Sequence, residues 1–366
     1  MTINRSIADL LRSHATIETT AHTAAAPGKN LIQNGNFTVA QRGTVTSPAS
    51  GAYLTDRWKN WQTTGGAVTV TKDTSGVFAA FGTDTAMKID VTTAESSVAS
   101  GDRFVVAQPI EAQNLQHLKY GLAGAEAITV SFCFRSPKSG THYVAIYQAD
   151  GDRYIWRPFT VASADTAEQF SLTFAADTGG TINNDTGIGL FLYFPLMAGS
   201  SFEAGSDNTW ASGEKYGAAT IQNLLDNTAN NIYIGLVQLE VGAATDFEFE
   251  DYETTDRICK RYFERWSFAA NKYHAIGQAY ATTGGIAVLY CQVVKRAAPT
   301  ITIETAAGGD FLIPGATFVA WNTSSFDDIV PEGGRHWMGC ASGLTAGDAV
   351  SCRVDANNPI DFSAEL

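Results

Sequence analysis

The strongest constraint on the fold is a series of short segments rich in β-branched and aromatic residues. Seven of them lie at 67–72, 87–91, 127–135, 143–148, 169–174, 187–194 and 231–240. Several alternate apolar with polar residues, as half-buried strands do. Clusters of Gly, Asn, Asp and Ser, which favour tight turns, separate them at 150–152 and 183–187. No helical periodicity intervenes, so the segments predict an antiparallel β-sandwich.

A second series of strands follows a short connecting region. Its candidates lie at 273–279, 285–294, 300–304, 316–321, 336–341 and 349–354. In the connecting region, two Phe alternate with two Glu at 247–250, which predicts one buried face and one solvated acidic face. Thr255 is expected to cap a short helix that carries Ile258, Tyr262 and Trp266 on one side.

The predicted fold class is therefore all-β, with two antiparallel β-sandwich (jelly-roll-like) domains behind a short N-terminal helix. We expect the first sandwich in residues 30–250, and the linking helix with the second sandwich in residues 251–366. Domains of about 100–200 residues are typical, so a chain of this length allows that division.

Residues 1–29 are expected to form a short helix and a linker of small, polar residues. A 4-3-4-3 spacing, typical of a coiled-coil seam, relates Ile3, Ile7, Leu10, His14 and Ile17. Isolated helices shorter than about 12–15 residues are marginal in water, so two heptads need a partner. Either identical chains form a small parallel bundle here, or one amphipathic helix packs on its own chain.

Charge and cysteine content exclude several classes of protein. The chain has 366 residues and a net charge of −13, so no basic excess is present to bind nucleic acid. The most apolar stretch, 188–197, is too short to span a membrane, and no apolar secretory signal precedes the strands. The odd number of cysteines, five, without a CxxC pair predicts reduced thiols. We expect synthesis in a cytoplasm, without membrane insertion.

Catalytic motifs are missing from the sequence. It contains no G-x-S-x-G elbow, phosphate-binding loop, H-E-x-x-H or dinucleotide fingerprint, and its six histidines are scattered. We therefore expect no catalytic residues, no cofactor and no metal. Two acidic loops, 150–152 and 206–208, offer oxygen ligands at short spacing, but hairpin turns explain them better than calcium sites. A glycosidase site built from carboxylates on separate strands is a remaining, less favoured alternative.

The aromatic residues are the most suggestive feature for function. Those near turns or at strand spacing are candidate glycan-binding residues, because an exposed ring can stack on the apolar face of a sugar: Trp58, Trp61, Tyr154, Trp156, Trp210, Trp321 and Trp337. Aromatic residues also dominate cores and subunit interfaces, and for any single Trp this structural role is favoured over glycan binding.

Three signatures in order resemble a family of bacteriophage virion proteins that includes tail-fibre, head-fibre and spike components. The first signature comprises Asn34-Gly35-Asn36-Phe37, Gln41-Arg42-Gly43-Thr44 and Asp56-Arg57-Trp58. The second runs from VQLEVG at 237–242 to Cys259, Tyr262 and Phe263. The third is KRAAPT at 295–300, and the last residues, SAEL at 363–366, also resemble the family's usual ending. Ala40 stands where the family often has Trp, and Thr55 where it often has Ala. The match covers the chain from about residue 30 onwards.

The motif residues themselves are expected to determine the fold. Asn34-Gly35 is a turn dipeptide, and Arg42 and Arg57 are expected to pair with carboxylates, of which Asp56 is the nearest candidate. Cys259, Tyr262 and Phe263 are expected to pack at the joint between the two domains.

The resemblance implies a non-enzymatic virion fibre or spike that binds a bacterial surface glycan for host attachment. It also implies a homo-oligomer, typically a trimer, with other virion proteins bound through the N-terminus. Similar carbohydrate-binding modules often hold a structural calcium through an Asp in the last strand, but Gly235 stands near that position, which speaks against a calcium there. The alternatives are a purely structural head-fibre, decoration or tail adaptor protein and, less favoured, a polysaccharide depolymerase.

Overall fold

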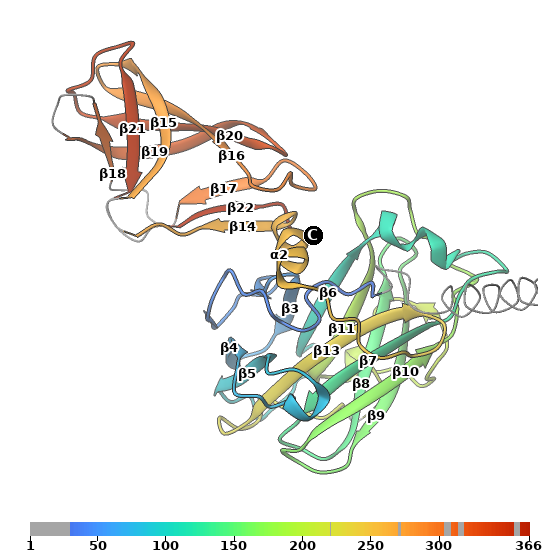
Figure 1. Cartoon of the computed structure of the whole chain (residues 1–366). Coiled ribbons are helices and arrows are strands. Elements are labelled where there is room, and N and C mark those ends of the chain that lie inside the picture. The colour runs from blue at the N-terminus through green and yellow to red at the C-terminus, as the bar shows by residue number, and fades with distance from the viewer. Residues whose placement is uncertain (1–29, 220, 270–271, 304–308, 314–317, 355–358) are drawn as a thin grey trace, which may run out of the picture.

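The computed structural model describes residues 30–366 except 220, 270–271, 304–308, 314–317 and 355–358. The helix, seam and linker expected in residues 1–29 lie outside the described residues, as do parts of the strands expected at 300–304 and 316–321. Figure 1 shows a β-sandwich, helix α2 beside it, and the C-terminal strands beyond that helix. Within the described residues, no helix has the length and apolar character needed to cross a membrane.

Two antiparallel sheets form the sandwich. The six-stranded sheet has the order β1 (Val45–Thr46), β4 (Ala67–Asp73), β5 (Ala86–Thr93), β13 (Asn231–Val241), β7 (Ile128–Arg135) and β10 (Ala167–Phe174). The seven-stranded sheet has the order β12 (Ala211–Ser212), β9 (Arg153–Val161), β8 (Gly140–Gln148), β11 (Ile188–Ala198), β6 (Arg103–Glu111), β3 (Trp58–Thr63) and β2 (Tyr53–Thr55). Short 3-10 helices lie at Ala79–Phe81, Ala112–Leu118 and Ser200–Phe202.

The space between the sheets is filled by apolar side chains from alternate strand positions. Phe132 of β7 meets Phe194 of β11 and Phe159 of β9 with ring centroids 5.1 and 5.0 Å apart, both edge to face. These contacts join strands of both sheets, and the alternation in the sequence is what brings every second residue to this core. The expected antiparallel sandwich in this part of the chain is confirmed.

The C-terminal strands are also antiparallel, which agrees with the all-β class. They are β14 (Phe263–Trp266), β15 (Lys272–Ala281), β16 (Gly284–Tyr290), β17 (Thr300–Ile303), β18 (Gly309–Leu312), β19 (Phe318–Val330), β20 (Gly333–Cys340), β21 (Ala349–Val354) and β22 (Ile360–Ser363). Six of them close into a barrel in the order β15-β16-β20-β19-β18-β21, and β14, β22 and β17 form a separate small sheet. Two facing sheets were expected, but β15 pairs with both β16 and β21 and so closes the sheet. A barrel and a sandwich both bury one face of each strand, so the sequence pattern is the same for both.

The connecting region differs from its prediction in two respects. Residues 242–250 form no strand, and Phe249 is 56% exposed, so the alternation of Phe and Glu does not bury an apolar face. Helix α2 (Tyr252–Lys260) begins one turn earlier than expected, because the Asp251 carboxylate accepts a hydrogen bond from the Thr254 backbone N–H. It ends before Tyr262, and Trp266 lies in β14 instead.

The junction is the contact between the sandwich and the small sheet β14-β22-β17 with residues 363–366. Arg57 is 1% exposed, and it donates to Glu365 Oε2 at 2.6 Å, Gln33 Oε1 at 2.7 Å and the Pro109 carbonyl at 2.9 Å. Its guanidinium also lies 3.5 Å from the centre of the Tyr262 ring. The expected carboxylate partner of Arg57, Asp56, is therefore replaced by a residue more than 300 positions away.

Arg42 strengthens the same junction. It pairs with Glu365 at 3.1 Å and reaches Asp56 at 3.9 Å, while its guanidinium lies 3.5 Å from the Phe263 ring centre. Cys259, Tyr262 and Phe263 are all buried, as expected of residues at this joint. The signature residues that resemble the virion family therefore determine how the chain packs.

The turn dipeptide has a structural role as well. Asn34 adopts a positive φ of 55°, and its side chain bonds to both backbone groups of Val39. A Cβ at Gly35 would lie 2.0 Å from the Val237 carbonyl oxygen, so this position requires glycine. The five cysteines are unpaired and four are buried; burial raises the pKa of Cys133 and Cys352 to about 12.

Candidate functional site

Four of the seven candidate glycan-binding aromatics are buried, and Trp58 and Trp321 are the most deeply buried of them. Trp58 is 0% exposed, packs on Phe37 and donates from its indole N–H to the Asn34 carbonyl at 3.3 Å. Trp321 is 1% exposed in the core of the barrel. Neither ring can stack on a sugar, because other side chains cover both faces. Both candidates are corrected to structural residues: a sequence position beside a turn does not determine whether a side chain points into the core.

Trp210 is partly buried and held by specific contacts. Its indole N–H donates to the Ala175 carbonyl at 2.7 Å, and Tyr120 lies edge to face against it at 5.7 Å. These contacts use the polar group and one edge of the ring. Trp210 therefore fastens the loop before β12 to the sandwich.

Three of the candidates come together on the outer face of the seven-stranded sheet. Trp61 lies on β3, and Tyr154 and Trp156 lie on β9, all in one aromatic cluster. Tyr154 and Trp156 are only 8% and 4% exposed, so these two candidates are corrected to packing residues, and Trp61 alone of the three is partly exposed. On β8 and β11 the cluster also contains Tyr143, Tyr147, Phe191 and Tyr193, which were not among the predicted candidates. Their spacing along β8 and β11 is even, and it places them on the same face. That spacing was the signal available in the sequence.

The register of the strands explains the row of rings. Tyr154, Tyr147 and Phe191 are direct neighbours across β9, β8 and β11. Phe191 stacks on Tyr193 at 5.3 Å and 14°, and Tyr147 stacks on Phe191 at 6.3 Å. Trp61 meets Phe191 edge to face at 6.5 Å. Offset and edge-to-face pairs of this kind are favourable for aromatic rings, so the row is a rigid surface.

A loop of the same chain covers part of this face. Tyr216 lies edge to face on Tyr193 at 5.3 Å, and Phe202 stacks on Tyr216 at 5.0 Å. Glu214 and Arg103 form an ion pair at 3.1 Å beside them. Burial and the nearby Glu214 carboxylate raise the pKa of the Tyr193 and Tyr216 hydroxyls well above their usual value. This part of the face is closed.

The remaining part of the face, which we call the open platform, consists of Trp61, Tyr147 and Phe191. Trp61 and Tyr147 are partly exposed, and Phe191 is 6% exposed between them. The Tyr147 hydroxyl donates to Asp152 at 3.0 Å; burial and this carboxylate raise its pKa to about 12. Lys59 lies 4.6 Å from the Trp61 ring centre. Lys59 itself is buried and donates to the Leu366 main-chain oxygen at 3.0 Å, so the polar group that the platform presents to solvent is the Asp152 carboxylate.

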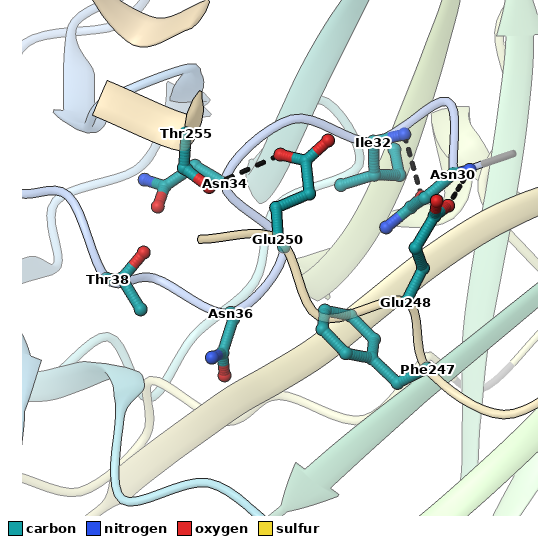
Figure 2. Close-up of a pocket in the computed structure, with 10 residues that line it drawn as sticks. Asn30, Ile32, Asn34, Asn36, Thr38, Phe247, Glu248, Glu250 and Thr255 are labelled. Atoms are coloured by element: carbon teal, nitrogen blue, oxygen red, sulfur yellow. Dashed lines mark hydrogen bonds between the residues drawn. The ribbon is translucent and has the colours of Figure 1, made fainter. Parts of the chain in front are cut away.

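A pocket between residues 30–38 and 247–255 is a separate feature (Figure 2). Its volume is about 30 Å³, the space of one water molecule. Glu250 accepts a hydrogen bond from Thr255 at 3.2 Å, and Glu248 accepts one from the Asn30 backbone at 3.0 Å (Figure 2). The pocket is too small for a sugar ring, and its carboxylates fasten the connecting region to the first residues of the sandwich.

The two acidic loops are turns. Asp150 accepts from the Asn183 backbone and amide groups at 2.9 and 2.7 Å, and Asn208 accepts from the Ala175 N–H at 2.9 Å. In the part of the chain that the structure describes, no three His, Cys, Asp or Glu side chains come together in a way that could hold a metal ion.

Comparison with known proteins gives a likeness of fold only. No family model matches the chain, and no curated protein matches it by sequence. Similar solved structures include the enzymatically active domain of tailspike protein 4 from bacteriophage CBA120, with 13% identity and a TM-score of 0.31, over 60% of this chain and 22% of that one. A putative sugar-binding protein from Bacteroides thetaiotaomicron matches with 14% identity and a TM-score of 0.33, over 58% of this chain and all of that one.

A tandem carbohydrate-binding module from Paenibacillus barcinonensis Xyn10C covers 94% of this chain and 99% of its own, with 10% identity and a TM-score of 0.28. The match to the tailspike spans about a fifth of that protein. All three TM-scores are below 0.5.

Proposed function

We propose that the protein binds carbohydrate through the open platform of Trp61, Tyr147 and Phe191. The observation that carries this proposal is the rigid row of rings, of which Trp61 and Tyr147 are partly exposed on the outer face of the sheet. An aromatic face that stays in contact with water in a folded protein favours ligands with an apolar side, and a pyranose ring has one. The exposed Asp152 carboxylate stands at the platform to bond sugar hydroxyls.

We further propose that the protein acts in a bacteriophage virion as a non-enzymatic attachment protein. The resemblance of the three sequence signatures to bacteriophage virion proteins supports this setting. Repeated weak sugar contacts gain avidity when several copies are displayed together. The net negative charge favours neutral glycans over acidic ones.

The test is a glycan array that includes bacterial surface polysaccharides, probed with the full chain. Trp61→Ala and Tyr147→Ala should each weaken binding about tenfold, since the loss of one aromatic contact costs on the order of 1.4 kcal/mol. Tyr252→Ala is the matched control, because Tyr252 is 59% exposed and lies at the start of helix α2, outside the platform. Equal binding by wild type and both platform variants would overturn the proposal. The appearance of new reducing ends in a polysaccharide incubated with the protein would contradict the non-enzymatic role.

A structural role in assembly is the second candidate, and one observation favours it. Ile276, Val288 and Tyr290 on the barrel are 79%, 53% and 70% exposed. Apolar side chains gathered on one outer surface often mark a contact between subunits. If the full chain binds no glycan, and Ile276→Ser with Tyr290→Ser lowers the oligomeric mass seen by light scattering, the assembly role is the better account.

A further inference from the structure

The barrel carries a hollow on its outer wall, away from the open platform. Its volume is about 300 Å³, at the lower end of known ligand pockets. Tyr280 of β15, Trp337 of β20 and the β19 residues Thr323 and Ser325 line it. These side chains come from three strands of one closed sheet, so their positions are fixed by the ladder hydrogen bonds.

Two glycines make the hollow. Gly284 and Gly339 are direct neighbours across β16 and β20. A Cβ at Gly284 would lie 2.4 Å from the Tyr280 hydroxyl, and one at Gly339 would lie 2.3 Å from the Thr323 hydroxyl. Because these two positions carry no side chain, Tyr280 can lie across the sheet and the Thr323 hydroxyl can reach the floor of the hollow. Replacement of Gly284 and Gly339 by larger residues would fill the hollow.

The two rings form a corner. Tyr280 and Trp337 lie 4.8 Å apart at an angle of 73°, and Tyr280 is 47% exposed. Arg335 lies 4.8 Å from the centre of the Trp337 ring, and Asp327 holds Arg335 through two bonds of 2.8 and 3.0 Å. The indole is therefore fixed before any ligand arrives, which lowers the entropy lost on binding.

The polar groups of the hollow are uncharged and available. Thr323 and Ser325 are exposed, and among the described residues neither hydroxyl makes a hydrogen bond. Arg335, which lies over Trp337, is neutralised by Asp327 and by Asp328, each at 2.8 Å. A corner of two aromatic rings with free hydroxyls on the third side suits a ligand with one apolar face and several hydroxyls, and it offers nothing to a charged group.

We propose that this hollow is a second carbohydrate site, which binds one neutral pyranose unit. The ring stacks in the corner of Trp337 and Tyr280, and its hydroxyls bond Thr323 and Ser325. This inference is independent of the platform: different strands build the two surfaces, and they share no residue. A chain with both sites binds a polysaccharide at two points.

Ligand-observed NMR with methyl glycosides tests the inference on the full chain. The probes are the methyl pyranosides of glucose, galactose, mannose and N-acetylglucosamine at millimolar concentration. The parent is Trp61→Ala/Tyr147→Ala, in which the platform is disabled, so remaining saturation transfer reports another site. We expect at least one methyl pyranoside to bind this parent, and addition of Trp337→Ala or of Thr323→Ala/Ser325→Ala to weaken it at least fivefold.

Thr323→Ala/Ser325→Ala keeps the test valid if Trp337→Ala fails to fold, since both hydroxyls are exposed and the thermal midpoint should not move. Tyr252→Ala, on helix α2, is the control and should leave binding unchanged. Two outcomes overturn the second site: no methyl pyranoside binds the parent, or binding is unchanged by both the tryptophan and the hydroxyl variants. If instead the platform is not a glycan site, the Trp61→Ala/Tyr147→Ala variant binds glycans as strongly as the wild-type protein does.

Discussion

The junction and the barrel both bury ionisable side chains, but they satisfy them to different degrees. At the junction, the buried Arg57 guanidinium has three hydrogen-bond acceptors and a stacked ring. In the barrel, His274 and His336 lie 5.5 Å apart, and three of their four ring nitrogens have no partner among the described residues. A buried polar group costs free energy unless it is paired. We therefore expect the junction to resist acid and the barrel to be the more sensitive of the two.

The largest expected effect is at the Lys295–Glu264 pair beside the junction. Both side chains are 0% exposed, the pair distance is 2.5 Å, and Glu264 also accepts from the Gln292 backbone at 3.1 Å. Lys295→Met leaves a buried carboxylate without its cation, which costs about 3–5 kcal/mol of unfolding free energy. Urea denaturation measures the change. Addition of Glu264→Gln should recover a large part of it, because a neutral amide needs no counter-charge; no recovery would mean that lost packing, not charge, caused the effect.

A smaller effect is expected for Glu365→Gln at the junction itself. The amide keeps an acceptor for Arg57 but removes the charge that both Arg57 and Arg42 face. Hydrogen bonds to charged groups contribute about 1.5–3 kcal/mol, so we expect a loss of about 2 kcal/mol. Hydrogen exchange should also speed up in β22 and in the β2–β3 turn, while the barrel strands keep their protection. Uniform loss of protection across the chain would show that the junction does not act as a local clamp.

Acid should weaken the barrel. Burial lowers the pKa of His274 to about 4 and that of His336 to about 3, where the neighbouring His274 adds to the effect. The unfolded chain binds these protons near pH 6.5, so stability is complete above that pH and falls as the pH drops towards 4. At pH 5.5 the loss is about 1.4 kcal/mol per histidine, at 1.36 kcal/mol per pH unit.

The measurement is the unfolding free energy between pH 7.5 and 5.5, with His274→Leu as the comparison. The variant lacks one of the two groups, so its pH-dependent loss should be about half that of wild type. A fluorescence probe near the barrel should report the transition before one at the junction. If His274→Leu and wild type lose the same unfolding free energy between pH 7.5 and 5.5, buried histidines do not make the barrel more acid-sensitive than the junction.

The sequence predicts the strands better than their arrangement. The expected segments 67–72 and 231–240 match β4 and β13 to within one residue at either end. Strand β6 was not predicted, and it contains Pro109, a residue that argues against a central strand. Its neighbours β3 and β11 pair with it nonetheless, and Phe191 stands opposite Pro109. Local propensity describes single strands, whereas pairing partners are decided by burial of the whole sheet.

The candidate sites show the same limit. The pair Tyr154 and Trp156 was found by its even spacing, but Tyr147 and Phe191 join Trp61 only because β8, β11, β6 and β3 lie in that order. The hollow on the barrel depends on two glycines that meet across β16 and β20, more than 50 positions apart. No local pattern encodes such a meeting. The role of Arg57 was expected correctly as a carboxylate pair, but the partner is distant in sequence.

The smallest expected effect comes from the exposed pair Lys119–Glu126, and it tests whether burial is what distinguishes the junction. Its distance is 3.2 Å, close to the 3.1 Å of Arg42–Glu365, but its side chains are 54% and 43% exposed. Water already solvates both groups, and exposed pairs contribute about 0.2–1 kcal/mol. Lys119→Gln should therefore change the unfolding free energy by less than about 1 kcal/mol, and 0.5 M salt should erase the difference. If Lys119→Gln lowers the unfolding free energy as much as Glu365→Gln does, ion pairing in general stabilises the junction, and the burial of Arg57 adds nothing to its stability.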